Sequence, residues 1–226
     1  MEGVHHPCIL ECMESFVHGP NIYIVMPHCS GGDLASLLGR QKKRRKRLPE
    51  EVVVDWFAQV ILGVEHLHSH NTLHRDLKSQ NIFLRRDHLD ASDPKGRSRV
   101  ALGDFGIARE LQFNKVAAKT FIGTPIFMSP EMFRQVPYGH KADIWALGCI
   151  LYEMMALTEP FQAKSMEGLV RQVQHSQPAK LPEEYTKHLR TLTLRMLAKN
   201  PDERQGLTLV HFSAQLERFV WDRGCA

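Results

Sequence analysis

The stretch from Asp143 to Leu157 constrains the fold more than any other part of the sequence, because it predicts a helix that is apolar on nearly every face. Its apolar residues are Ile144, Trp145, Leu147, Cys149, Ile150, Leu151, Met154 and Met155. The stretch is shorter than the roughly 18 apolar residues of a membrane span and carries two acids. The sequence therefore predicts a helical domain built around this segment, with no membrane contact.

Shorter patterns predict the elements around this helix. Runs of β-branched and aromatic residues, bounded by turn signals, predict strands at 9–17, 21–26, 82–84 and 100–102. Helical spacing of apolar residues predicts a short helix after Asp33, a long helix from Pro49 to about His68, and helices at 165–174, 184–198 and 208–220. The fold class that follows is α+β.

The positive charge of the chain lies in one run. The 226 residues carry a formal net charge of +4, but residues 40–47 hold seven basic residues and no acid, so the rest of the chain sums to −3. We expect this run to be an exposed loop. A nucleic-acid partner is not expected, because a protein that binds nucleic acid through general electrostatics spreads its positive charge more widely. A nuclear localisation signal or a nucleic-acid patch is the alternative interpretation of the run.

The cysteines indicate a reducing compartment. There are five, at Cys8, Cys12, Cys29, Cys149 and Cys225, without a C-x-x-C pair. Such a set is typical of free thiols in an intracellular protein and not of a disulfide framework or a zinc site. No secretory signal is visible after Met1. We therefore expect a cytoplasmic protein.

Three short motifs follow one another in a specific order. His74-Arg75-Asp76-Leu77-Lys78-Ser79-Gln80-Asn81 precedes a predicted strand, Asp104-Phe105-Gly106 follows the next strand, and Ser129-Pro130-Glu131 comes later. Any one of them can occur by chance, but the three in this order and context form a highly specific signal. On these motifs the chain resembles the eukaryotic protein kinases.

Longer segments narrow the resemblance. HRDLKSQNIFL, LGDFGIAR, KTFIGTP and KADIWALGCILYE resemble the NIMA-related (NEK) serine/threonine kinases, over most of the chain from His6 to about Phe219. The resemblance implies a protein-kinase-like fold, consisting of a mainly helical C-lobe with a residual β-hairpin from the N-lobe. Residues 1–30 would be the N-lobe remnant and hinge, 31–220 the C-lobe, and 221–226 a tail.

The resemblance implies phosphoryl transfer from Mg²⁺-ATP to a serine or threonine hydroxyl of a protein substrate. Asp76 would accept the hydroxyl proton, and Lys78 would neutralise the γ-phosphate. Asn81 and Asp104 would hold Mg²⁺, since hard cations prefer oxygen ligands. The adenine site would be formed by Met26 as gatekeeper, by Pro27, His28 and Cys29 as hinge, and by Phe83 beneath the ring.

The resemblance also predicts a regulatory phosphosite. Thr120 lies between the second and third motifs, where protein kinases carry the activating phosphate. A phosphate on Thr120 could bind Arg75 through charge-assisted hydrogen bonds and order the segment. Thr124 is expected to face the catalytic loop with its hydroxyl.

Other polar residues are expected to be structural. Glu131 and Arg204 would form a buried pair, and Asp143 would support the same lobe. Histidines 66, 68, 70 and 74 suggest a metal cluster, but in this family such residues end a helix and enter the catalytic loop, so no zinc is expected.

The sequence departs from the family pattern at its start. It contains no G-x-G-x-x-G loop, no V-A-I-K lysine and no partner glutamate, and Met1 falls in or just before the linker that follows helix C. Because an active kinase needs the Lys–Glu pair, we expect very low activity from these 226 residues alone. A catalytically inactive, kinase-like binding module is the alternative. The complete set of Asp76, Lys78, Asn81 and Asp104 favours the enzyme, which family analogy places at the cytoskeleton or in the nucleus.

Overall fold

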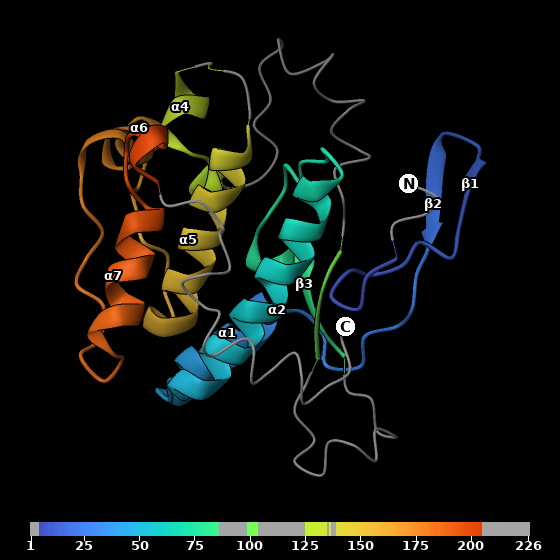
Figure 1. The fold of residues 1–226 in the computed structure, drawn as a ribbon, viewed down its shortest axis with the longest axis horizontal. Coiled ribbons are helices and arrows are strands. Elements are labelled where there is room, and N and C mark those ends of the chain that lie inside the picture. The colour runs from blue at the N-terminus through green and yellow to red at the C-terminus, as the bar shows by residue number, and fades with distance from the viewer. Residues whose placement is uncertain (1–4, 86–98, 104–124, 135, 137–138, 205–226) are drawn as a thin grey trace.

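A computed structural model describes residues 5–85, 99–103, 125–134, 136 and 139–204 (Figure 1). The elements in chain order are β1 Glu14–His18, β2 Asn21–Val25, α1 Leu34–Arg44, α2 Glu50–Ser69, η1 Ser79–Asn81, β3 Ile82–Arg85, β4 Arg99–Leu102, η2 Pro125–Phe127, α4 Pro130–Phe133, α5 His140–Ala156, α6 Met166–His175, α7 Lys187–Met196 and η3 Pro201–Glu203. Helices form the body, and the strands pair as two separate antiparallel hairpins. The α+β prediction is confirmed.

Helix α5 lies at the centre of the body, as its apolar faces predict. Trp145, Leu147 and Ile150 have no exposed surface. The helix packs against α2, α7 and the short helices η2 and η3. A side chain at Gly148 would come within 2.9 Å of the Cβ of Met196, so glycine allows α5 and α7 to approach closely. The helix begins at His140, three residues earlier than the apolar pattern indicates.

The other predicted helices occur near their expected positions. Helix α2 follows Pro49 and buries the apolar face that contains Val53, Phe57, Val60, Ile61, Val64 and Leu67. Helices α6 and α7 match the predictions at 165–174 and 184–198 within a few residues at each end. The predicted helix at 208–220 lies outside the described residues. No helix in the described part of the chain is long and apolar enough to cross a lipid bilayer.

The expectation that residues 40–47 form a loop is wrong for residues 40–44. Helix α1 continues through Arg44, and Arg45 ends it in a left-handed conformation with φ 53°. The Asp33 side chain begins the helix by accepting a hydrogen bond from the Ser36 amide at 2.8 Å. Lysine and arginine have good helix propensity, and cations are favourable in a last turn, where the helix dipole is negative.

The predicted strand at 9–17 is also only partly correct. Regular pairing starts at Glu14, whereas Cys8, Ile9 and Leu10 are buried against β4 instead. The Leu10 amide donates to the Leu102 carbonyl at 2.7 Å, and the Leu102 amide donates to the Cys8 carbonyl at 2.8 Å. Ile9 therefore extends the β3–β4 sheet by one isolated parallel bridge, because its side chain is buried in the core.

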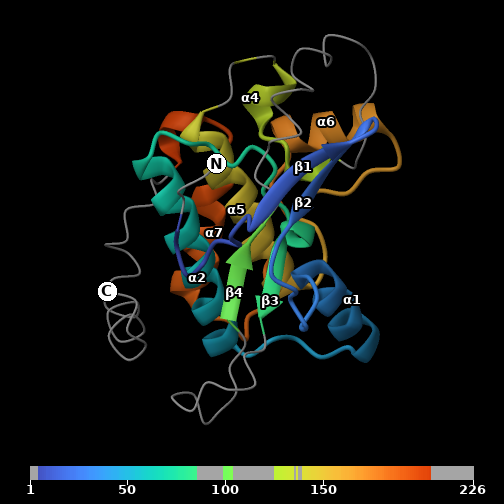
Figure 2. The ribbon, with the colours of Figure 1, turned by 90° about the vertical axis from the view of Figure 1, so that its right-hand side faces the viewer.

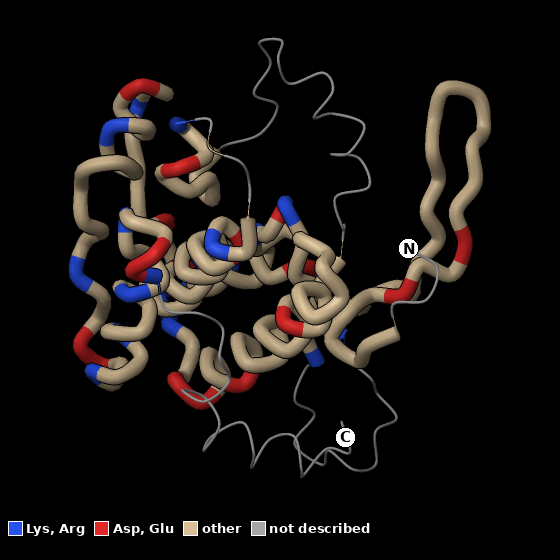
Figure 3. Tube along the Cα trace, turned by 45° about the horizontal axis from the view of Figure 1, so that its top comes forward, with Lys and Arg blue, Asp and Glu red and all other residues tan. Residues whose placement is uncertain are grey.

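The β1–β2 hairpin stands apart from the helical body (Figure 1). Every residue of both strands is exposed, and the Phe16 and Tyr23 rings stack at 5.2 Å. Figure 3 shows hardly any charge along it. Its exposed apolar side chains are Phe16, Val17, Ile22, Tyr23, Ile24 and Val25. A contiguous apolar surface of this kind is typical of a contact with further protein.

Candidate active site

The segment between α2 and β3, residues 70–81, which we call the catalytic segment, brings together Asp76, Lys78 and Asn81. The Lys78 ammonium lies 2.7 Å from Asp76 Oδ2. The Asn81 side-chain amide donates to the same oxygen at 3.1 Å and to the Asp76 backbone carbonyl at 2.9 Å. Asp76 and Lys78 remain partly exposed, whereas Asn81 is buried. The arrangement presents one carboxylate oxygen, positioned by two donors, at the surface of the catalytic segment.

Asp143 at the start of α5 anchors this segment. Its buried carboxylate accepts hydrogen bonds from the His74 amide at 3.1 Å and the Arg75 amide at 3.2 Å. His68 Nε2 lies 2.7 Å from the same carboxylate. Arg75 has a φ of 66°, which is uncommon for a residue with a side chain. The hydrogen bonds to Asp143 hold that backbone conformation directly before Asp76.

His74 is a buried polar residue of this segment with no exposed surface. Burial lowers the pKa of its imidazole, and the negative charges of Asp143 and Asp76 only partly oppose that effect. The other histidines at the end of α2 contact one another or α5. The His66 ring stacks on His6 at 4.8 Å, and the His68 ring lies 4.4 Å from the His140 ring.

The residues predicted to meet adenine lie where β2 returns to the body. Met26, Pro27 and Cys29 are partly buried, and His28 is exposed. The chain then pairs with β3, because the Gly31 amide donates to the Leu84 carbonyl at 3.0 Å. Phe83 lies on the same strand, and a side chain at Gly103 would approach its ring to 2.5 Å. The adenine-binding roles of these residues stay predictions.

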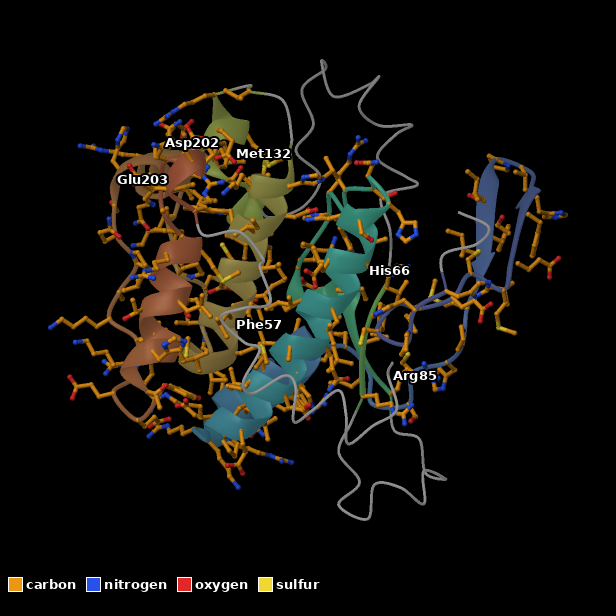
Figure 4. All side chains as sticks on the ribbon, viewed as in Figure 1. Phe57, His66, Arg85, Met132, Asp202 and Glu203 are labelled. Carbon is orange, nitrogen blue, oxygen red and sulfur yellow. The ribbon has the colours of Figure 1, made fainter. Side chains whose placement is uncertain are left out.

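Glu131 and Arg204 form a buried pair between α4 and the end of η3. The two guanidinium nitrogens of Arg204 each lie 2.6 Å from a Glu131 carboxylate oxygen. Arg204 also donates to the Ala198 carbonyl at 2.8 Å and is only 1% exposed. Burial alone would raise the pKa of Glu131, but the hydrogen bonds from Arg204 bring this pKa below its usual value. Figure 4 shows Met132 of α4 at the same end of the molecule as Asp202 and Glu203.

Glu153 is a titratable residue near the catalytic segment that sequence reasoning did not single out for a role. Burial raises the pKa of its carboxyl to about 7, and the nearby Ser79 hydroxyl and the Lys42 charge oppose the rise. Within the described residues, Oε2 of Glu153 has no hydrogen-bond partner. An acid inside an otherwise apolar helix is the sequence signal that could have identified it.

We expect Glu153→Gln to stabilise the protein more at pH 8 than at pH 5. The folded chain holds the Glu153 proton up to a pH of about 7, whereas an unfolded glutamate releases it near 4.5. As the pH rises from about 4.5 to about 7, ionisation of Glu153 therefore lowers the free energy of unfolding of the wild-type protein by about 3 kcal/mol at most. The glutamine variant does not undergo this loss. Urea unfolding at both pH values measures the difference, with Glu183→Gln as the exposed control. A gain that does not change with pH would contradict the assignment.

Three predicted site residues, Asp104, Thr120 and Thr124, lie outside the described residues. Gly103, which directly precedes Asp104 in the sequence, donates its amide hydrogen to the Asn81 carbonyl at 2.9 Å. The end of β4 and the end of the catalytic segment are thus adjacent. The roles of Asp104, Thr120 and Thr124 stay predictions.

The protein kinase domain family matches residues 1–214, and the chain belongs to this family. Within it, the chain is similar to the NIMA-related kinases. It is 42% identical over 203 residues to the serine/threonine-protein kinase Nek3 of Mus musculus, covering 90% of this chain and 37% of that protein. It is 38% identical over 224 residues to Nek1 of Mus musculus, covering 97% of this chain and 18% of that protein. It is 40% identical to Nek2 of Homo sapiens, over 87% of this chain and 44% of that protein.

The chain thus spans less than half the length of these curated relatives. Its family and its resemblance to the NEK subgroup follow from the comparisons together with the motifs.

Proposed function

We propose that the chain forms the catalytic-loop part of an ATP-dependent serine/threonine kinase. One observation carries this proposal: Asp76 Oδ2 lies 2.7 Å from the Lys78 ammonium and 3.1 Å from the Asn81 amide, in a segment anchored by buried Asp143. A docking surface has no physical need for a partly exposed carboxylate held by two donors. Relatives that carry the name serine/threonine-protein kinase support the same class of reaction.

The residues of the catalytic segment have distinct roles in this proposal. Asp76 accepts the proton of the attacking serine or threonine hydroxyl. Lys78 brings a positive charge next to that carboxylate, where the terminal phosphate of ATP arrives. Because phosphoryl transfer passes through a loose transition state, positioning and charge neutralisation supply most of the catalysis. Asp143 maintains the positions by holding the backbone of His74 and Arg75.

The side chain of Asn81 fits a magnesium ligand. Its amide nitrogen donates to Asp76, so its carbonyl oxygen is the atom offered to a cation. Oxygen ligands suit Mg²⁺, and the resemblance adds the Asp104 carboxylate as the second ligand. When bound with ATP, Mg²⁺ would neutralise the charge of the phosphates.

The function is tested on a version of the protein in which an N-lobe with a glycine-rich loop and a V-A-I-K lysine precedes these 226 residues, which we call the full-length protein. Incubation with radiolabelled ATP, Mg²⁺ and a mixture of protein substrates should place the label on serine and threonine and not on tyrosine. The 226 residues alone should turn over far more slowly than the roughly 1–100 s⁻¹ of ordinary kinases, because they contain no glycine-rich loop or V-A-I-K lysine. Labelling no greater than that of an Asp76→Asn variant would point to the inactive binding module.

We also propose regulation through Thr120, with Arg75 as the partner of its phosphate. In the full-length protein, Thr120→Ala should remove the activation that phosphorylating treatment produces, and Thr124→Ala tests the neighbouring threonine. Kinase assays before and after treatment measure the response. If Thr120→Ala keeps full activation, the switch is wrong. If Arg75→Ala still responds normally, the phosphosite stands but Arg75 is not the partner of its phosphate.

The protein substrate and the location in the cell stay predictions.

A further inference from the structure

The C-terminal end of α1 carries the densest charge on the described part of the molecule. Six consecutive cations, which we call the basic cluster, are all exposed: Lys42, Lys43, Arg44, Arg45, Lys46 and Arg47. The helix ends at Arg44, and Arg45 turns the chain with its left-handed backbone, so the side chains surround one helix end. Within the described residues, one ion pair involves the cluster, between Arg47 and Glu184 at 3.1 Å. Most of its charge is therefore available to a partner.

The basic cluster lies at the end of a helix that packs against the catalytic segment. Helix α1 packs against η1 and β3, which follow Asp76 in the chain, and Figure 2 shows α1 beside β3. Lys42 is close enough for its charge to lower the pKa of Glu153, the same carboxyl that the Ser79 hydroxyl affects. Ser79 belongs to the catalytic segment, three residues after Asp76. The cluster is thus within reach of a polypeptide whose hydroxyl is at Asp76.

We infer that the basic cluster docks an acidic stretch, rich in aspartate and glutamate, of the protein substrate. This inference rests on the proposed kinase function and adds a substrate class to it. Charge complementarity is the physical basis, since within the described residues the six cations of the cluster make one ion pair, between Arg47 and Glu184. The docked stretch would raise the local concentration of the substrate without contributing to the chemical step.

The surroundings of the cluster favour a protein segment over a nucleic acid. Residues 40–47 include no aromatic side chain on which a base could stack. Glu50 and Glu51 follow the cluster in the chain, Glu183 directly precedes its ion-pair partner Glu184, and the chain outside residues 40–47 sums to −3. A long polyanion would be repelled beyond the helix end, whereas a short acidic stretch fits the compact cluster.

The dimensions of α1 set the spacing that the substrate needs. The start of α1 lies beside β3, since Asp33 forms a bridge with Phe83 and the Gly31 amide donates to the Leu84 carbonyl. The cluster lies one helix length further on, which is about 16 Å for 11 residues, and an extended peptide covers that length in about five residues. We therefore expect the acidic stretch to begin about five residues or more from the serine or threonine. An acidic stretch next to the hydroxyl would be too close to reach the cluster.

Three synthetic peptides test this inference on the full-length protein. Each contains one serine among neutral residues, and two also carry a block of six glutamates, placed either directly beside the serine or six residues away. We expect the distant block to lower KM at least tenfold with little change in kcat, and added salt to remove most of the gain. The adjacent block should give no such advantage.

A charge variant and a matched control locate the effect. Lys43→Gln/Arg44→Gln/Lys46→Gln should abolish the KM advantage, since glutamine keeps the helix propensity but removes three charges. The variant leaves three residues of the cluster unchanged. Lys42 influences the pKa of Glu153, Arg45 ends the helix, and Arg47 pairs with Glu184. As a control, Arg171→Gln/Lys180→Gln/Lys187→Gln removes three exposed charges from α6, α7 and the segment between them. The control should keep the full advantage.

The possible outcomes separate the inference from the proposed function. No phosphorylation of any peptide would contradict the function; fluorescence anisotropy of a labelled hexaglutamate peptide would still test the docking. Equal KM values for all three peptides, or an advantage that the charge variant retains, would overturn the inference.

A seven-nucleotide oligothymidylate, which carries six phosphates, is the competing probe. If it binds more tightly than the hexaglutamate peptide and the charge variant loses that binding, the cluster is a nucleic-acid site and the inference is wrong.

Discussion

Asp76→Asn is expected to lower kcat by about 10²- to 10⁴-fold in the full-length kinase while the fold and the affinity for ATP persist. The amide has nearly the shape of the carboxylate but cannot accept the hydroxyl proton. The backbone of the segment stays in place, because Asp143 holds the amides of His74 and Arg75 and not the side chain of Asp76. Steady-state kinetics, thermal unfolding and nucleotide titration measure the three quantities separately.

Two further variants make this result specific to Asp76. Asp104→Ala should weaken the binding of Mg²⁺-ATP in addition to the rate, because the resemblance assigns Asp104 to the metal. Asp202→Asn changes an exposed aspartate of η3 and should leave all three quantities unchanged. Equal losses of nucleotide affinity in Asp76→Asn and Asp104→Ala would contradict the assigned roles.

Arg204→Met is expected to lower the free energy of unfolding by about 3–5 kcal/mol. The substitution leaves the Glu131 carboxylate buried without its two hydrogen bonds of 2.6 Å. The backbone carbonyls of Lys141 and Ala198 also lose a donor, since Arg204 serves both. Urea unfolding at neutral pH measures the loss. A loss below about 1 kcal/mol would show that the pair behaves like a surface salt bridge.

A double-mutant cycle separates the pair from its surroundings. Glu131→Leu alone leaves Arg204 charged and buried, so it should also be strongly destabilising. The double variant Glu131→Leu/Arg204→Met removes both charges, and its loss should be clearly smaller than the sum of the single losses. Losses that simply add would mean that the two residues stabilise the fold independently.

The elements that sequence predicted best are those whose pattern is strong along the chain itself. Apolar spacing located α2 and α5 because each buries several helical turns. The basic run was harder to assign, since exposed lysines and arginines suit a helix end as well as a loop. The apolar character of Ile9 predicts a regular strand, but it is equally compatible with the single bridge that Ile9 forms with Leu102.

The sequence indicates which residues belong to the site, but not which of them contact one another. Motif order indicated Asp76, Lys78 and Asn81, and the structure brings these three within hydrogen-bonding distance of one another. The contact between His68 and Asp143 joins residues 75 positions apart, and no local pattern encodes it. The same holds for Glu153, whose raised pKa depends on burial that only the packed body creates.

The distance along the chain between Glu131 and Arg204 has a consequence for biosynthesis. The two partners are 73 residues apart, and a ribosome that adds about 5 to 20 residues per second needs about 4 to 15 s to make that stretch. Asp143 and the whole of α5 are made during this time, while the Glu131 carboxylate has no Arg204 guanidinium to accompany it into the interior. The nascent chain can therefore anchor its catalytic segment before it can dock α4. We therefore expect α4 to dock late, since its buried partner Arg204 lies at the end of η3.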